Sequence, residues 1–459
     1  MKKSTKLGLF LFLGMFLGAL WVLLSPLPVA SSQGEKPLAY EVNLGIEHPG
    51  LLPSNPFYFV KEWTRNVRRA MIFRETKKAD LELVILNERA AEIARLAAIV
   101  PDNKAVLNSA LIAYEVSAQG LLNQLLSKNY RESGQLDNLL SRITEMTLKH
   151  YLILSSLPEA EPAFTGGFGG HSPALNKSLA VLAAVLADDP TNVSGFVSQV
   201  RKITSLNKQP WQSLRYAEAL NRLAAQLPLP LQPKIFHLKE DLLLNFAVEA
   251  RANSFPLLLA GLVPGDLVTR LVSLDELRAK IDDREFKNQL SLIRQGVLRK
   301  LEEDRQISSQ AIDQLVNQAK VIAGGLESQK SLPVSAKGLL NQTKFYFDQV
   351  ASFKEQAQEG AALGQASLAL ASAKGAAYST WVAREDYENE LDFIKNTYDG
   401  LVSAGGDQER LAAVERKIAS LADFIQAVTA SGINEKTETL LFNVKLELLS
   451  IAAGTGQRR

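Results

Sequence analysis

The sequence predicts an all-α protein in which an N-terminal signal or anchor segment precedes helical hairpins and bundles. Residues with strong helix propensity, such as Ala, Leu, Gln, Glu and Lys, recur throughout, whereas aromatic residues make up only 7% of the chain. Apolar residues repeat at alternating steps of three and four in several long stretches, which places them on one face of a helix. For the helices after residue 173, bundles and an irregular helical array stay open as alternatives.

The composition fits a large folded protein without disulfides. Of the 459 residues, 46% are hydrophobic and 22% are charged, which is enough apolar material for two or three helical domains. Basic and acidic residues nearly balance at 51 against 49, so neither a general polyanion-binding surface nor a nucleic-acid partner is expected. Cysteine is absent, which excludes disulfides, thiolate metal sites and cysteine nucleophiles.

The N-terminus carries the pattern of an export signal. Three lysines within the first six residues precede an uncharged apolar run over residues 7–24. This charge asymmetry predicts that the rest of the chain lies outside the cytoplasmic membrane. The run is long for a signal peptide and just long enough to span a bilayer, and small residues behind it offer a cleavage site. Residues 1–31 are therefore either a cleaved signal peptide or a retained membrane anchor, and residues 32–50 are a tether.

Residues 51–157 are expected to form an N-terminal helical bundle. Asn55 can cap a first helix that begins at Pro56. Two later stretches with heptad-like apolar spacing are separated by the break Pro101-Asp102-Asn103, which predicts an antiparallel hairpin. A further helix over about 135–157 completes the bundle.

Two apolar seams define the predicted hairpin. The polar residues beside the first seam, among them Asn87 and Glu92, are expected to point away from it. The seams consist of Ala79, Leu83, Leu86, Ala90, Ile93, Ala97 and Val100, and of Leu107, Leu111, Tyr114, Ala118, Leu121 and Leu125.

Seven basic residues lie in the first helix and its exit. A short tether separates them from the N-terminal apolar run, so they are candidate contacts with the membrane or another polyanion. A solvated helix face is the alternative. Neighbouring Tyr58, Phe59 and Trp63 either support interfacial membrane binding or fill the hairpin core. The seven basic residues are Lys61, Arg65, Arg68, Arg69, Arg74, Lys77 and Lys78.

Three segments of this region carry a family resemblance: Leu51-Leu52-Pro53-Ser54-Asn55-Pro56-Phe57-Tyr58-Phe59-Val60-Lys61, Asn87-Glu88-Arg89-Ala90-Ala91-Glu92 and Lys149-His150-Tyr151-Leu152. They resemble the Leu-Pro-x-x-Pro-x-Tyr-x-x-Lys opening, the Arg-x-x-Glu helix and the Lys-His element of the bacterial domain of unknown function 5667 family. The resemblance covers about residues 51–157. It implies a helical domain behind a signal or anchor segment, and it brings no established activity, cofactor or catalytic residue.

Beyond residue 157, glycines and prolines divide the chain. A glycine cluster near residue 168 lacks the lysine and hydroxyl of a phosphate-binding loop, so it is expected to be part of a linker. Small residues over 360–377 predict closely packed helices, and a last heptad seam is predicted after residue 410. The regions are a Gly/Pro linker at 158–173, a middle helical region at 174–330, a C-terminal helical region at 331–455 and a tail at 456–459. The last seam consists of Leu411, Val414, Ile418, Leu421, Ile425 and Val428.

The residues with chemical potential favour structural roles. His150 lies on the apolar side of its helix without a second ligand three or four residues away, so we predict a core histidine rather than a metal ligand. Asp283 stands beside a helix end and is predicted to cap it. No serine has the sequence context of a nucleophile elbow. We therefore assign no catalytic, cofactor-binding or metal-ligating residue and expect no cofactor.

The function expected from these observations is that of a non-enzymatic cell-envelope interaction or scaffold protein, secreted or anchored by its N-terminal helix. Its partners would be the membrane, through the N-terminal segment, and another protein, through helical seams. The alternative is an exported binding protein for a lipid or other hydrophobic ligand. A helical envelope hydrolase is a third candidate, because paired carboxylates can assemble from distant helices without a local motif.

Overall fold

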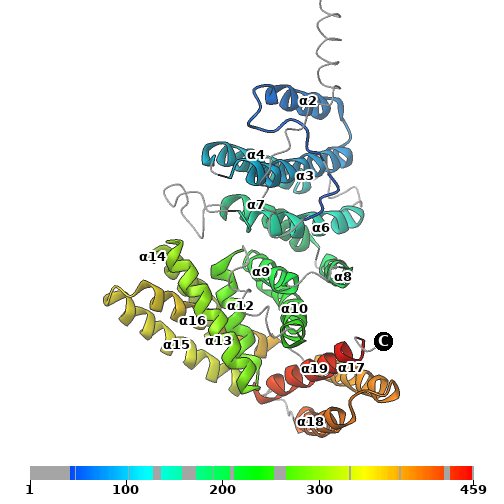
Figure 1. The fold of residues 1–459 in the computed structure, drawn as a ribbon, viewed down its shortest axis with the longest axis vertical. Coiled ribbons are helices and arrows are strands. Elements are labelled where there is room, and N and C mark those ends of the chain that lie inside the picture. Colours follow the sequence, from blue (N-terminus) through cyan, green and yellow to red (C-terminus); the bar gives the residue numbers. More distant parts are fainter. Residues whose placement is uncertain are drawn as a thin grey trace, which may run out of the picture. The chain divides into compact units, whose positions relative to one another are not determined.

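A computed structural model shows that the described residues form α-helices, with one 3-10 turn and no strand (Figure 1). The all-α prediction is confirmed. The expected signal or anchor at 1–31 and the linker residues 158–171 lie outside the described residues, so those expectations stay predictions. No helix of the described part is long and apolar enough to cross a membrane. The structure describes residues 42–46, 48–101, 103–127, 136–157, 172–189, 191–206, 211–252, 265–329, 332–381, 384–427 and 435–456.

The N-terminal region contains the predicted hairpin. Helices α3 and α4 pack against each other along the two seams, and seam residues such as Leu83 and Tyr114 are almost completely buried. The Asn103 side chain caps α4 by accepting from the Val106 backbone N–H at 3.2 Å. The hairpin prediction is confirmed. The helices are α2 (Tyr58–Met71), α3 (Glu75–Ile99), α4 (Lys104–Leu125) and α6 (Leu136–Leu154).

The predicted start of the first helix is wrong by two residues. Helix α2 begins at Tyr58 rather than at Pro56. The reason is a turn at Asn55, whose side chain accepts a hydrogen bond from the Phe57 N–H at 2.9 Å and whose carbonyl accepts from the Tyr58 N–H at 3.0 Å.

The predicted outward direction of Asn87 and Glu92 on α3 is also wrong. Both side chains are buried, because other segments of the chain cover that side of α3. Asn87 donates to the carbonyl of Leu44 at 3.0 Å and lies 3.1 Å from a ring nitrogen of His150. Glu92 is covered by α2.

The helices that follow share a continuous core with the hairpin. Helix α7 packs on α4 and α6, α9 packs on α10 and α12, and α16 packs on α12, α14 and α15. One hydrophobic cluster extends from Ala79 in α3 to Tyr378 in α16. The elements are α7 (Ser172–Asp188), α8 (Asn192–Leu206), α9 (Gln212–Ala224), η2 (Leu229–Leu231), α10 (Gln232–Ala252), α12 (Leu267–Lys280), α13 (Arg284–Glu303), α14 (Ser309–Glu327), α15 (Val334–Glu355) and α16 (Glu359–Trp381).

The small residues of α16 allow close packing, as predicted. Ala366, Ala369 and Ala373 are fully buried. A Cβ atom added at Gly375 would lie 3.3 Å from a methyl group of Leu339 in α15, so the two helices approach more closely there than a larger residue permits.

The C-terminal helices α17 (Arg384–Ser403), α18 (Gln408–Ala427) and α19 (Glu435–Gly456) build a second hydrophobic cluster. Helix α19 also packs on α10, and its Phe442 and Leu446 belong to the larger cluster. The heptad prediction is confirmed for Leu411, Val414, Ile418, Leu421 and Ile425, which are all buried, while Val428 lies outside the described residues.

Candidate functional site

Arg65 lies at the centre of the contact between α2 and α3. Its side chain is fully buried, and its guanidinium donates to Glu88 and Glu92 of α3 at 2.9 and 2.6 Å. It also donates to Glu62 of α2 at 2.5 Å and to the Tyr58 hydroxyl at 3.1 Å. The Tyr58 hydroxyl in turn donates to Glu92 at 2.6 Å. Removing one member of such a buried network leaves the others uncompensated, so the network holds α2 firmly on α3.

Further ion pairs extend this contact along α2 in both directions. Lys61 Nζ lies 2.6 Å from a carboxylate oxygen of Glu92. Arg69 donates two hydrogen bonds to Glu82, at 2.7 and 2.8 Å, which is the bidentate geometry that makes such pairs strong. The charged face of α2 is therefore the face that packs on α3.

The seven basic residues singled out in the sequence lie in different surroundings. Lys61, Arg65 and Arg69 form ion pairs with carboxylates of α3. The basic residues of α2 and the carboxylates of α3 are both visible in the sequence, but their pairing depends on how the two helices pack. The other four are Arg74 and Lys77, which are exposed, and Arg68 and Lys78, which are half-buried.

The opposite face of α2 is apolar and exposed. Phe59, Trp63 and Met71 keep 66%, 61% and 70% of their surface accessible, so the interpretation that Phe59 and Trp63 fill the hairpin core is wrong. An amphipathic helix of a folded protein usually buries its apolar face. In α2 this polarity is reversed, because the partners on α3 are carboxylates. We call this surface the outer face of α2, and it comprises Phe59, Val60, Trp63, Val67, Ala70 and Met71.

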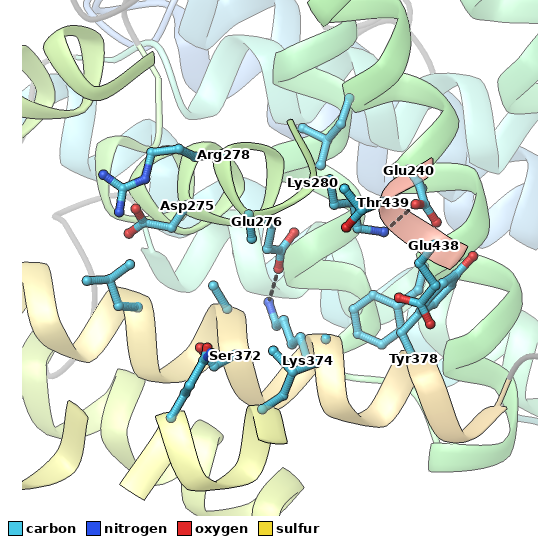
Figure 2. Close-up of a pocket in the computed structure, with 18 of the residues that line it drawn as sticks. Glu240, Asp275, Glu276, Arg278, Lys280, Ser372, Lys374, Tyr378, Glu438 and Thr439 are labelled. Carbon is cyan, nitrogen blue, oxygen red and sulfur yellow. Dashed lines mark hydrogen bonds and ion pairs between the residues drawn. The ribbon is translucent and has the colours of Figure 1, made fainter. Parts of the chain in front are cut away.

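A cavity of about 320 Å³ lies among α10, α12, α13, α15, α16 and α19 (Figure 2). Figure 2 shows Glu276 on α12 facing Lys374 on α16, with Arg278 and Asp275 on one side of this pair and Tyr378 and Glu438 on the other. The lining combines these charged groups with apolar side chains from α10, α15 and α16. Such a mixture is typical of pockets for small molecules, in which a few polar groups orient an otherwise apolar ligand.

Two buried lysines share one carboxylate in this cavity. Lys239 Nζ lies 2.6 Å from one oxygen of Glu276, and Lys374 Nζ lies 3.6 Å from the other. Both ammonium groups also donate to Asn221 Oδ1, at 3.2 and 3.0 Å. Burial lowers the pKa of Lys239 to about 8, and the attraction of Glu276 opposes that shift. Burial also lowers the pKa of Lys374, and Glu276 again opposes the shift, so two buried amino groups depend on one carboxylate.

The remaining carboxylates of the cavity are compensated in other ways. Asp275 accepts from Arg294 at 2.6 Å and from the Ser367 hydroxyl at 2.8 Å, and Glu240 forms an ion pair with Lys280. Burial raises the pKa of Glu438 to about 7. The cavity thus contains no carboxylate that is both ionised and unpaired among the described residues at mildly acidic pH.

Among the described residues, two cations at the edge of the cavity form no ion pair with a carboxylate, although the charge of Arg278 opposes the rise that burial causes in the pKa of the nearby Asp275. Arg278 donates to the Ser291 hydroxyl at 3.3 Å, and Ser291 donates to the carbonyl of Lys287 at 2.9 Å. The Arg278 guanidinium therefore lies against α13, about one turn from the backbone of Lys287. Both are half-buried and both line the cavity. Within the described residues, no carboxylate forms an ion pair with either side chain.

The remaining predicted site residues have structural roles. His150 is buried and lies 2.9 Å from the Tyr114 hydroxyl, and burial lowers its pKa to about 3, so the core-histidine prediction is confirmed. Asp283 caps α13 by accepting from the Phe286 N–H at 3.0 Å, as predicted. In the part of the chain that the structure describes, no three histidine or carboxylate side chains are placed to hold a metal ion.

Sequence reasoning missed the cavity. Its charged groups come from helices far apart in the chain, and no local motif connects Lys239, Glu276 and Lys374. A local sign was the position of Lys374 within the otherwise small and apolar stretch of α16, where a charge is costly unless it has a partner.

The comparisons with known proteins identify the N-terminal region. Residues 50–158 match the family described as Domain of unknown function (DUF5667), which confirms the resemblance over residues 51–157. No curated protein and no solved structure matches the chain.

Proposed function

Given that residues 50–158 belong to the DUF5667 family, whose description names no function, we propose that the protein is a non-enzymatic cell-envelope interaction protein. It is exported or tethered through its N-terminal segment, and the outer face of α2 lies on the surface of the membrane. The observation that carries this proposal is the reversed polarity of α2, whose charged face is paired with α3 and whose apolar face is exposed.

The length of the chain before α2 supports this placement. Residues 25–41 separate the apolar run 7–24 from the first described residue, Val42, and covalent geometry limits the reach of a segment of that length to at most about 60 Å. Val42 and Leu44 pack against the core that contains α3. If the apolar run is held in the bilayer, α2 is therefore within reach of the same membrane.

The chemistry of the outer face favours a bilayer over a protein groove. Trp and Phe side chains are enriched where a protein meets the membrane–water interface. Each large side chain that enters the bilayer contributes up to roughly 1.5–3 kcal/mol. The exposed Arg74 and Lys77 follow α2 directly, and each adds about 1 kcal/mol beside anionic headgroups. Tethering makes such weak contacts effective, because the second contact becomes intramolecular.

The first test concerns location. Cells that express the full chain are fractionated, and the mature N-terminus is determined by mass spectrometry. Retention of Met1 in the membrane fraction supports a tethered protein, and cleavage near Ser31 supports an exported one. A cytosolic protein with an intact N-terminus would overturn the envelope assignment.

The second test concerns α2. Hydrogen exchange of residues 58–71 is measured for the full chain in vesicles with and without phosphatidylglycerol. We expect slower exchange with the anionic lipid, and we expect Phe59→Gln/Trp63→Gln to abolish that protection. The matched control is Ile112→Gln/Val116→Gln, because these α4 residues are 61% and 68% exposed. Equal loss in both variants, or no protection in the parent chain, would contradict the proposal.

A second candidate function is the binding of a small molecule with apolar character. The specific observation in its favour is the cavity of about 320 Å³, which falls at the lower end of the roughly 300–1,000 Å³ of known ligand pockets. Because Asp275 and Glu276 are engaged with Arg294 and Lys239, the cavity favours binding over hydrolysis.

A further inference from the structure

We propose that the cavity among α10, α12, α13, α15, α16 and α19 binds a small anionic amphiphile, a molecule with one carboxylate or phosphate group and a short apolar chain. This inference names the ligand class for the second candidate function and rests on that function. It does not depend on membrane contact by α2.

The charged groups of the cavity wall favour an anionic ligand. Lys239 and Lys374 are 5% and 7% exposed and share the single carboxylate of Glu276, so one of the two buried amino groups has no carboxylate of its own. A charge removed from water in this way is costly unless it is paired. An anionic group elsewhere in the same cavity would reduce this cost through space.

The edge of the cavity offers a place for the anionic group. The Arg278 guanidinium contacts Ser291, about one turn along α13 from the backbone of Lys287, and both side chains line the cavity. A guanidinium and an ammonium group in one cavity suit carboxylate and phosphate oxygens, because the former binds them in a bidentate manner and the latter adds a point charge. Neither cation forms an ion pair within the described residues, and Asp275 attracts Arg278 only through space, so a ligand would not have to break an ion pair.

The apolar part of the lining offers a place for the chain of the ligand. Leu243, Leu339 and Leu368 contribute to the wall from α10, α15 and α16, and Ala371 leaves space beside them. A volume of about 320 Å³ fits a short chain rather than a membrane lipid with two long chains. The ligand class is therefore a single-chain amphiphile.

The two ends of the cavity set the orientation of the ligand. Figure 2 shows Arg278 and Glu438 on opposite sides of the Glu276–Lys374 pair. Glu438 gains a negative charge as the pH rises, so it disfavours an anionic group at its end. The anionic group is therefore placed beside Arg278 and Lys287.

Photolabelling tests this inference with the full chain. The probe is decanoate with a diazirine near the end of its chain, and labelled peptides are mapped by mass spectrometry. We expect labelling of α10, α15 or α16, and competition by decanoate or decyl phosphate. Decanol and inorganic phosphate are expected to compete at least ten-fold less well. Decanoate and decyl phosphate as separate competitors distinguish a carboxylate site from a phosphate site. Equal competition by decanol would overturn the role of the anion, and equal competition by inorganic phosphate would overturn the role of the chain.

Paired variants locate the anionic group. Arg278→Gln/Lys287→Gln is expected to lower labelling about ten-fold at a limiting probe concentration, because each charge-assisted contact is lost. Arg299→Gln/Lys300→Gln makes the same charge change on side chains of α13 that are 76% and 38% exposed, and we expect no effect. Equal labelling of the two variants would overturn the inference.

A separate control distinguishes binding in the cavity from contacts made by the outer face of α2. Phe59→Gln/Trp63→Gln should leave labelling of the cavity unchanged, even where it abolishes membrane contact. Labelling that maps to α2 and disappears in this variant would overturn the cavity assignment. Thermal unfolding by circular dichroism confirms that each variant is folded before labelling is compared.

Discussion

Replacement of Arg65 by methionine is expected to release α2 from α3 while the rest of the bundle stays folded. Arg65 is fully buried and donates to four side chains. Methionine keeps the apolar stem but removes the charge, which leaves the buried Glu92 with Lys61 and Tyr58. Breaking a buried ion pair from one side costs about 3–5 kcal/mol. Release of α2 avoids this cost, because Glu92 then becomes hydrated.

The assay is native-state hydrogen exchange followed by mass spectrometry. A loss of about 3 kcal/mol in the opening free energy of α2 corresponds to exchange roughly 100-fold faster over residues 58–71. The control is Arg68→Met, whose side chain is 40% exposed and lies 3.4 Å from Glu88, so its loss should cost less than about 1 kcal/mol. Equal exchange of α2 in the two variants would refute the reasoning. So would a loss of protection in α3 as large as that in α2.

Three further predictions concern the core and its buried titratable groups. Burial raises the pKa of Glu438 from 4.5 to about 7, so the contribution of this one group to stability is fully present below pH 4.5 and is lost as the pH rises through this window. Glu438→Gln should resist urea better than the parent at pH 8, by about 1–3 kcal/mol, and the difference should shrink towards pH 4.5. Burial lowers the pKa of His150 from 6.5 to about 3, so protection of α6 from hydrogen exchange should fall as the pH drops through this window, and less so in His150→Gln. Leu83→Ala, at a side chain that is 2% exposed, should lower the free energy of unfolding by about 2–5 kcal/mol. Val84→Ala, at a side chain that is 39% exposed, should lower it by less than about 1 kcal/mol. Similar losses at the two positions in thermal unfolding would contradict the core assignment.

The helical seams could be predicted from the sequence because they are local patterns. Leu83, Leu86 and Ile93 recur at steps of three and four, and one helix suffices to place them on a common face. The break at Pro101 and the cap at Asn103 are also local. The sequence therefore predicts the hairpin of α3 and α4 without any knowledge of the later helices.

Which face of α2 packs on α3 could not be predicted in the same way. The sequence shows an apolar side with Phe59 and Trp63 and a basic side with Arg65, and the usual rule buries the apolar side. The deciding fact is that Glu88 and Glu92 of α3 face α2. That fact depends on which side of α3 is left uncovered by α4 and α6, and it is therefore a property of the packing.

The cavity was beyond sequence reasoning for a related reason. Lys239, Glu276 and Lys374 lie on α10, α12 and α16, and their spacing along the chain carries no signal. Their meeting depends on the packing order of the helices after residue 173, which the sequence left open.

The central claim is that the outer face of α2 contacts the membrane, and Trp63 fluorescence tests it most directly. In the full chain, Trp21, Trp211 and Trp381 are replaced by phenylalanine, and the protein is placed in vesicles with brominated lipids, which quench nearby indoles. A second chain that keeps Trp211 alone is the control, because this side chain is 8% exposed in the core. The account predicts strong quenching of Trp63 and little quenching of Trp211. Membrane-bound protein with unquenched Trp63 would contradict it.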